Sequence, residues 1–97
     1  MDGEIAQAKR RVHLKIKGQV QRVFFRSNIR SWASMLGVTG WVKNTEDYVE
    51  AILEGDQEQI QELIHFCREG PKGSIVDDVE VEEQKYRGEY INFEIKY

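Results

Sequence analysis

The stretch VHLKIKGQVQRVFFRSNIRSWASMLG, residues 12–37, contains the two periodicities that decide the fold. Apolar and polar residues alternate over residues 12–17, which is typical of a strand with one buried and one exposed face. Gly18 ends this strand, and the residues after it show neither alternation nor a helix cap, which indicates a loop. From Phe25, apolar residues recur every three or four positions, as on the buried face of a helix, and Gly37 stands where a C-terminal cap is expected.

The next part of the chain predicts a hairpin and a second helix. Residues 39–45 and 48–54 have the pattern of two strands joined by a short turn. Asp56 precedes Gln59 by three positions, which is a capping-box pattern at the start of a helix, and Gly70 ends that helix. The apolar stripe of this helix consists of Ile60, Leu63, Ile64 and Cys67.

Two short strands complete the predicted set. The first is rich in acidic residues and contains Val79 and Val81, and the last alternates Ile91, Phe93 and Ile95 with polar residues. The order β-α-β-β-α-β with a last short strand indicates the α+β class. It predicts a ferredoxin-like split β-α-β sandwich, in which two helices cover one face of a mostly antiparallel sheet of about five strands.

The length and composition fit one domain. The chain has 97 residues, of which 40% are apolar, enough for one packed core. We expect residues 1–10 to be a loosely ordered lead-in and residues 11–97 to form a single domain. The lead-in contains Asp2 and Glu4 and no apolar run, so no secretory signal is expected. The basic triplet at residues 9–11 fits a solvated entrance to the first strand better than an RNA contact.

Charge and cysteine content restrict the partners. Lys and Arg total 14 against 17 Asp and Glu, and this net charge of −3 disfavours broad binding to nucleic acid or to an anionic membrane. The apolar runs are too short for a membrane helix. The single cysteine, Cys67, excludes an internal disulfide and a cysteine-based metal cluster. We therefore expect a cytoplasmic protein that is a monomer.

The remaining titratable residues favour structural roles. His13 and His65 have no carboxylate or cysteine at a metal-binding spacing, so no metal site is expected. Cys67 lies on the core stripe and has no activating neighbour, which is typical of an inert buried thiol. The carboxylates within residues 77–83 fit the solvated face of an edge strand, where charge discourages aggregation.

One arrangement points to chemistry. Arg26 falls in the first turn of the first predicted helix, where the helix dipole disfavours a cation unless an anion is bound. The free N–H groups of the loop and first turn form an anion site, and a guanidinium can hold a phosphoryl group with two hydrogen bonds. The alternative is a surface arginine that lies over the loop. Ser27 is expected to turn away from the loop.

Asn44 is the second candidate. It stands at the end of the second strand, beside the hairpin, and its amide both donates and accepts, so it can orient a water molecule. The alternative is an asparagine that merely flanks a turn. RNA binding through the open sheet face would need exposed aromatic residues on central strands. Tyr48 is one such residue, but the acidic fourth strand opposes that function.

Three segments resemble motifs of one family. GQVQRVFFR at residues 18–26 is similar to the phosphate loop of acylphosphatases, and GWVKN at residues 40–44 is similar to their second motif. The ending FEIKY is also similar, so the resemblance covers residues 12–97. It implies a five-stranded ferredoxin-like sheet, no metal, no cofactor, and hydrolysis of a small acyl phosphate to a carboxylate and inorganic phosphate, which is also the expected inhibitor.

The resemblance also implies roles for individual residues. Arg26 corresponds to the substrate-binding arginine and Asn44 to the asparagine that orients the attacking water. Thr45 is the expected supporting neighbour of Asn44. The phosphate-binding segment consists of Gln21, Arg22, Val23, Phe24, Phe25 and Arg26.

Arg22 departs from the family pattern, which usually has glycine there. Glycine at that position suits a positive φ or a close approach of backbone to phosphate. A guanidinium there instead raises the local positive potential. The alternative function is therefore a catalytically weak module of the same fold that binds a phosphorylated ligand or regulates a partner. The residues do not identify the physiological acyl phosphate.

Overall fold

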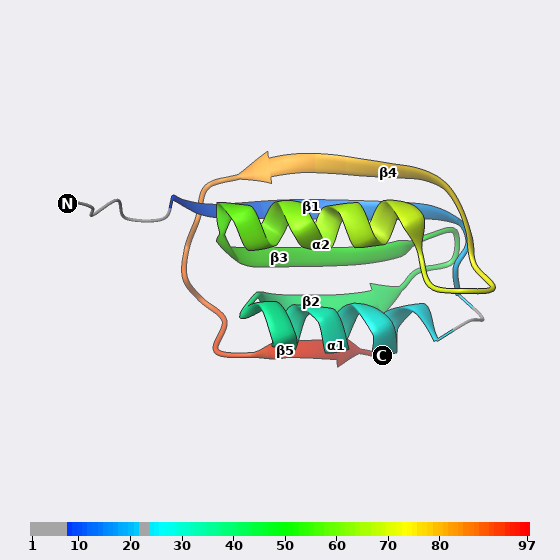
Figure 1. Cartoon of the computed structure of the whole chain (residues 1–97), viewed down its shortest axis with the longest axis horizontal. Helices are drawn as coiled ribbons and strands as arrows, with labels where there is room; N and C mark the ends of the chain where they lie inside the picture. The colour runs from blue at the N-terminus through cyan, green and yellow to red at the C-terminus, as the bar shows by residue number, and fades with distance from the viewer. Residues whose placement is uncertain (1–7, 22–23) are drawn as a thin grey trace.

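A computed structural model describes residues 8–21 and 24–97 of the chain, which form one sheet with two helices on one of its faces (Figure 1). The elements in chain order are β1 (Lys9–Gln19), α1 (Phe25–Leu36), β2 (Thr39–Asn44), β3 (Val49–Asp56), α2 (Gln57–Glu69), β4 (Ile75–Gln84) and β5 (Phe93–Lys96).

The strand order in the sheet is β4-β1-β3-β2-β5. All neighbouring strands are antiparallel except β2 and β5, which run parallel. The two helices lie side by side over the sheet, α2 above β1 and β3, and α1 above β2 and β5 (Figure 1). This arrangement confirms the predicted α+β, ferredoxin-like architecture.

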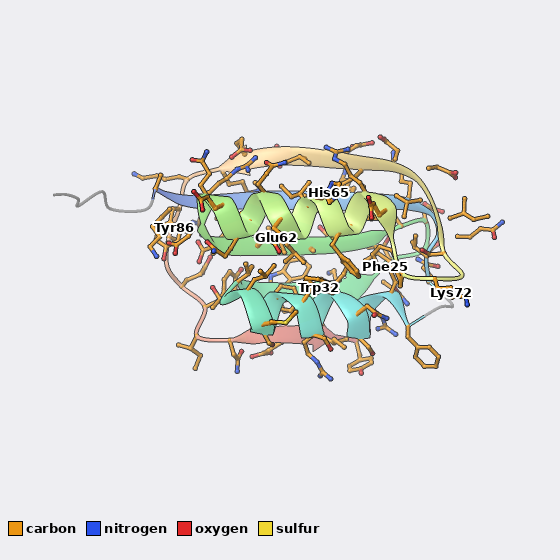
Figure 2. All side chains as sticks on the ribbon, in the orientation of Figure 1. Phe25, Trp32, Glu62, His65, Lys72 and Tyr86 are labelled. Carbon is orange, nitrogen blue, oxygen red and sulfur yellow. The ribbon has the colours of Figure 1, made fainter. Side chains whose placement is uncertain are left out.

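The core lies between the helices and the sheet. The apolar side chains of residues 12–16 in β1 are fully buried, as their alternation predicts, and so are those of Phe25 and Ile29 in α1. Trp32 of α1, labelled in Figure 2, and Phe66 of α2 join the helices, with ring centroids 5.1 Å apart. The stripe predicted for the second helix is buried and consists of Ile60, Leu63, Ile64 and Cys67.

Cys67 is part of this core, and its thiol is unreactive. Burial raises the pKa of its thiol to about 12, while the nearby Arg68 lowers it only in part. The thiol therefore stays protonated near neutral pH, which removes it as a nucleophile.

The first strand is longer than the alternation predicts. β1 begins at Lys9, which pairs with Asp56 of β3, so the end of the expected lead-in belongs to the sheet. At the other end Gly18 does not stop the strand: the register with β4 shifts between Lys17 and Gly18, and pairing continues to Gln19. Gly18 has a φ of +133°, and this backbone lets β4 pass closer than any side chain would allow.

The predicted capping box at α2 is wrong. Asp56 is the N-cap residue, but its side chain makes no hydrogen bond to the helix. Its carboxylate instead accepts a hydrogen bond from Lys9 Nζ at 2.6 Å. The pairing of β1 with β3 brings the ammonium group opposite Asp56, so a charged donor competes with the backbone amides.

The last strand is shorter than predicted. β5 starts at Phe93, which pairs with Gly40 of β2, and Ile91 lies before the strand with 95% of its surface exposed. Alternation continues through Ile91 in the sequence, but β2 offers no partner beyond that register.

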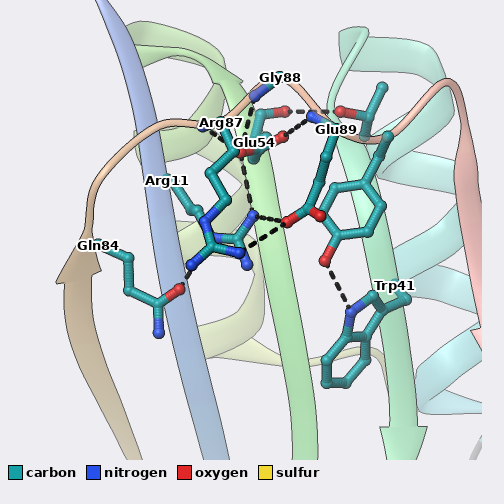
Figure 3. A network of polar contacts seen from close by, with 9 residues as sticks. Arg11, Trp41, Glu54, Gln84, Arg87, Gly88 and Glu89 are labelled. Atoms are coloured by element: carbon teal, nitrogen blue, oxygen red, sulfur yellow. Dashed lines mark hydrogen bonds and ion pairs between the residues drawn. The ribbon is translucent and has the colours of Figure 1, made fainter.

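A buried carboxylate holds the connection between β4 and β5. Glu54 of β3 is 1% exposed and accepts hydrogen bonds from the backbone N–H groups of Arg87, Gly88 and Glu89 at 2.9–3.2 Å (Figure 3). Arg11 Nη1 of β1 donates to the same carboxylate at 3.1 Å. Burial alone raises the pKa of Glu54, but these hydrogen bonds outweigh it and hold the pKa below its ordinary value.

Gly40 provides a test of the β2–β3 pairing. Its φ is +135°, and a Cβ added there would overlap the carbonyl oxygen of Ile52 on β3. We expect Gly40→Ala to lower the free energy of unfolding by about 3 kcal/mol in urea titrations. Gly37→Ala is the control, because Gly37 also has a positive φ but no atom within 4 Å of the added carbon; it should cost about 1 kcal/mol. Equal losses would contradict the close approach at Gly40.

The Glu54 carboxylate predicts a loss of stability in acid. Its folded pKa lies below the reference value of 4.5, so its contribution is complete above about pH 5 and is lost as the pH falls through the folded pKa. We expect Glu54→Gln to be about 3 kcal/mol less stable than the native protein at pH 7, because Arg11 loses a buried partner. The difference should shrink as the pH falls below 4.

The control for this measurement is Glu80→Gln. Glu80 pairs with Lys17 at 2.6 Å on the exposed edge strand β4, where solvent screens the charges. The free energy of unfolding of Glu80→Gln at pH 7 should stay close to that of the native protein. A loss as large as that of Glu54→Gln would contradict a special role for the buried carboxylate.

Candidate active site

A pocket of about 200 Å³ lies where α1 begins. Figure 1 shows that the end of β5 and the C-terminus come close to this end of α1. The residues that line the pocket are Gln21, Phe24, Phe25, Arg26, Ser27, Ile95 and Tyr97. The pocket therefore joins the loop after β1, the first turn of α1 and the end of the chain.

The N-terminus of α1 is shaped to receive an anion. Phe24 precedes the helix in the left-handed conformation, with φ 56° and ψ 32°. No side chain among the described residues caps the helix, and its first turn contains no acidic residue. The N–H groups of the first turn are therefore available to a bound anion, and the helix dipole favours one.

Arg26 stands in this first turn and faces the same pocket. Its guanidinium carbon lies 5.2 Å from the centroid of the Tyr97 ring, which is a cation–π distance. The stacking holds the guanidinium over the pocket despite the unfavourable helix dipole. Arg26, the arginine predicted from the sequence, therefore lies in the same pocket as the first turn of α1.

Gln21 ties the loop to the turn between β2 and β3. Its side-chain Nε2 donates to the carbonyl oxygens of Thr45 at 2.7 Å and of Tyr48 at 3.1 Å. Thr45 Oγ1 accepts from the N–H groups of Tyr48 at 3.1 Å and Asp47 at 3.3 Å, which fixes the shape of that turn. Gln21 of the first motif therefore contacts the turn that directly follows the second motif.

Asn44 is the last residue of β2 and pairs with Val49 across the hairpin. Its side-chain Oδ1 is buried and has no hydrogen-bond partner among the described residues. Buried acceptors in proteins nearly always have a partner, so this oxygen is available to a bound water or ligand. Asn44 does not line the pocket of Arg26; its link to that pocket runs through Thr45 and Gln21.

The structure and the sequence-based expectations differ at several site residues. Ser27 is one of the residues that line the pocket, although its side chain is expected to turn away from the phosphate cradle. Ile95 and Tyr97 also line it and were not predicted as site residues, although both belong to the quoted ending FEIKY. Arg22 and Val23, predicted for the phosphate-binding segment, lie outside the described residues.

Both histidines have a carboxylate neighbour, which the sequence does not reveal for His13 but does reveal for His65, four residues before Glu69 on one helix. His13 Nε2 lies 2.6 Å from Glu50 Oε2 on the adjacent strand, and His65 Nε2 lies 3.2 Å from Glu69 on the surface of α2. In the described part of the chain, no group of three or more His, Cys, Asp or Glu residues is arranged to hold a metal ion. No helix in residues 8–21 or 24–97 is long and apolar enough to cross a membrane.

Comparisons with known proteins agree with one another. A family model described as Acylphosphatase matches residues 12–95. An acylphosphatase of Pelotomaculum thermopropionicum is 43% identical over 91 residues, which cover 93% of this chain and 99% of that protein. One of Pyrobaculum arsenaticum is 46% identical over 87 residues, which cover 88% of this chain and 92% of that protein.

Solved structures resemble this one over most of its length. An acylphosphatase from Coxiella burnetii matches with a TM-score of 0.86 and 35% identity, covering 91% of this chain and 93% of that one. Full-length HypF in a phosphate- and nucleotide-bound form matches with a TM-score of 0.87 and 27% identity. That match covers 99% of this chain and 13% of HypF.

Proposed function

This chain belongs to the acylphosphatase family and is a hydrolase of acyl phosphates, and we propose that it acts by in-line attack of water on a phosphoryl group held at the N-terminus of α1. The observation that carries the proposal is the uncapped first turn of α1 beside the Arg26 guanidinium in one pocket. Both features favour an anion at the same place.

The phosphoryl group is held by backbone N–H groups and by Arg26. The amides of the loop and the first turn contact its equatorial oxygens, and the planar guanidinium donates two hydrogen bonds to the same group. Donors held by the first turn of a folded helix need little reorganisation, so they stabilise the charge of the transition state. Inorganic phosphate, a product of the reaction, fits the same donors and acts as an inhibitor.

Asn44 orients the attacking water. Its Oδ1, which has no hydrogen-bond partner in residues 8–21 and 24–97, accepts a hydrogen bond from the water, which turns a lone pair of the water oxygen toward phosphorus. Thr45 supports Asn44 by fixing the turn that follows it. The amide group is a weak base, so it positions the water without removing its proton.

The reaction needs neither a strong acid nor a covalent intermediate. The bond between water oxygen and phosphorus forms while the bond from phosphorus to the acyl oxygen breaks, and the carboxylate leaves without protonation. A phosphate oxygen of the substrate accepts the proton of the water. Ser27 lines the pocket, but no histidine or carboxylate among the described residues lines it with Ser27 to activate a hydroxyl nucleophile.

We also propose a compartment, an oligomeric state and a class of partner for the enzyme. We place it in the cytoplasm as a monomer that acts on a small molecule and binds neither nucleic acid nor membrane. The net charge of −3 and the charged edge strand β4, with its ion pair from Glu80 to Lys17, support this setting. The mechanism requires no metal and no cofactor.

Arg26→Lys tests the role of the guanidinium. Lysine keeps the positive charge, but its ammonium group is compact rather than planar. It therefore cannot form the paired hydrogen bonds or the same stacking on Tyr97. We expect kcat/KM for benzoyl phosphate to fall at least about a hundredfold, with weaker inhibition by inorganic phosphate. Arg30→Lys, an exposed change later in the same helix, is the control and should hydrolyse at the native rate. Native turnover by Arg26→Lys would end this assignment.

Asn44→Ala separates binding from chemistry. We expect kcat to fall about a hundredfold, because the water loses its orientation, while the inhibition constant of inorganic phosphate hardly changes. The melting temperature should stay near the native value, since the amide oxygen that is removed has no hydrogen-bond partner in the described part of the chain. Asn92→Ala, an exposed asparagine before β5, is the control. A loss confined to KM would instead make Asn44 a substrate contact.

A further inference from the structure

Phe24 is an unusual residue of the pocket at the start of α1, because it stands at the solvent-exposed edge of that pocket. It lines the pocket together with Arg26, yet 81% of its surface is exposed to solvent. Exposure of a whole aromatic ring gives no folding benefit, since the favourable contribution of such a side chain comes from its burial. A ring in this position therefore favours a ligand over a role in folding.

The backbone at Phe24 is held in an unusual conformation. Phe24 is the one non-glycine residue of the described chain with a positive φ. Its carbonyl oxygen accepts two hydrogen bonds from Asn28, from the backbone N–H at 3.0 Å and from Nδ2 at 2.9 Å. The strained conformation is thus fixed from the helix side, and strain retained beside a site is a feature of functional positions.

The opposite side of the rim is also apolar. Tyr97 is fully exposed, and its ring stacks on the Arg26 guanidinium. Ile95 of β5 lines the pocket beside it and is half-buried. The pocket therefore combines a cationic guanidinium and free N–H groups with a rim of two aromatic rings and one aliphatic side chain.

We propose that Phe24 and Tyr97 form a subsite for the acyl part of the substrate, so that the enzyme prefers acyl phosphates with an aromatic or bulky apolar acyl group to acetyl phosphate. The inference rests on the proposed function, because it takes the phosphoryl group to be held by Arg26 and the first turn of α1. A phosphoryl group held there leaves the acyl group at the solvent side of the pocket, where these rings stand. Contact with the acyl group buries rings that are otherwise exposed.

The test compares two substrates that share the phosphoryl group. The ratio of kcat/KM for benzoyl phosphate to that for acetyl phosphate is measured for the native protein and for Phe24→Asn. Asparagine tolerates the left-handed conformation and removes the ring. The two anhydrides differ in intrinsic reactivity by the same factor for every variant, and a change in the amide cradle affects both substrates, so neither alters the comparison.

We expect the ratio to fall roughly fivefold in Phe24→Asn, which is the scale of one lost aromatic contact. Phe24→Leu keeps an apolar side chain, so its ratio should lie between the ratios of the native protein and of Phe24→Asn. Ile91→Asn is the control, because Ile91 is another exposed apolar residue but lines a different pocket. It should leave the ratio at the native value. An unchanged ratio in Phe24→Asn overturns the subsite.

A binding measurement on the native protein keeps the inference testable if the variants fail to fold. Phenylphosphonate and methylphosphonate carry a similar anionic head, and displacement of inorganic phosphate reports their affinities. Tighter binding of phenylphosphonate supports the subsite, and equal binding overturns it. A native protein that hydrolyses neither acyl phosphate overturns the proposed function instead, and the phosphonate comparison then still decides the apolar rim.

Discussion

The buried, ionised carboxylate of Glu54 is the constraint on which the rest of the structure depends. Three backbone N–H groups of residues 87–89 and the Arg11 guanidinium satisfy it, and these contacts fix the crossover from β4 to β5. β5 can pair with β2 only if that crossover is in place, and β5 leads to Tyr97, the ring on which Arg26 stacks. A charge at one end of the sheet thereby supports an anion pocket at its other end (Figure 1).

The pocket achieves its chemistry with few side chains. The anion site that we propose consists of backbone N–H groups at the start of α1, which no side chain of the described residues caps, and of one guanidinium. Such donors carry no proton that the reaction must move, so their contribution is electrostatic and is fixed by folding. Gln21 makes this contribution depend on the hairpin, because it bonds two carbonyl groups of the turn that follows Asn44.

Periodicity predicts the parts of this molecule that have a regular pattern. The alternation of residues 12–17 and the stripe of α2 identify the core, and the position of Arg26 in a first turn predicts that it stands beside the pocket at the start of α1. The role of Glu54 could not be predicted, because in the sequence it is one polar residue of an alternating strand and its partners are distant in the chain, with Arg11 before it and residues 87–89 after it. Two contacts could not be predicted for the same reason, namely the stacking of Tyr97 on Arg26 and the hydrogen bond from Lys9 to Asp56. Each depends on which strands become neighbours in the sheet.

The parallel pairing of β2 with β5 has a consequence for how activity is acquired during folding. Parallel strands require a long connection, and here the connection spans β3, α2 and β4 before β5 closes the edge of the sheet. Closing so long a loop costs chain entropy before any contact rewards it, and the same holds for β4 pairing with β1, so we expect both pairings to form after the β2–β3 hairpin. The ring that stacks on Arg26 comes into place with β5. We therefore expect the pocket to be completed late in folding, so that a partly folded chain without β5 lacks one of its walls.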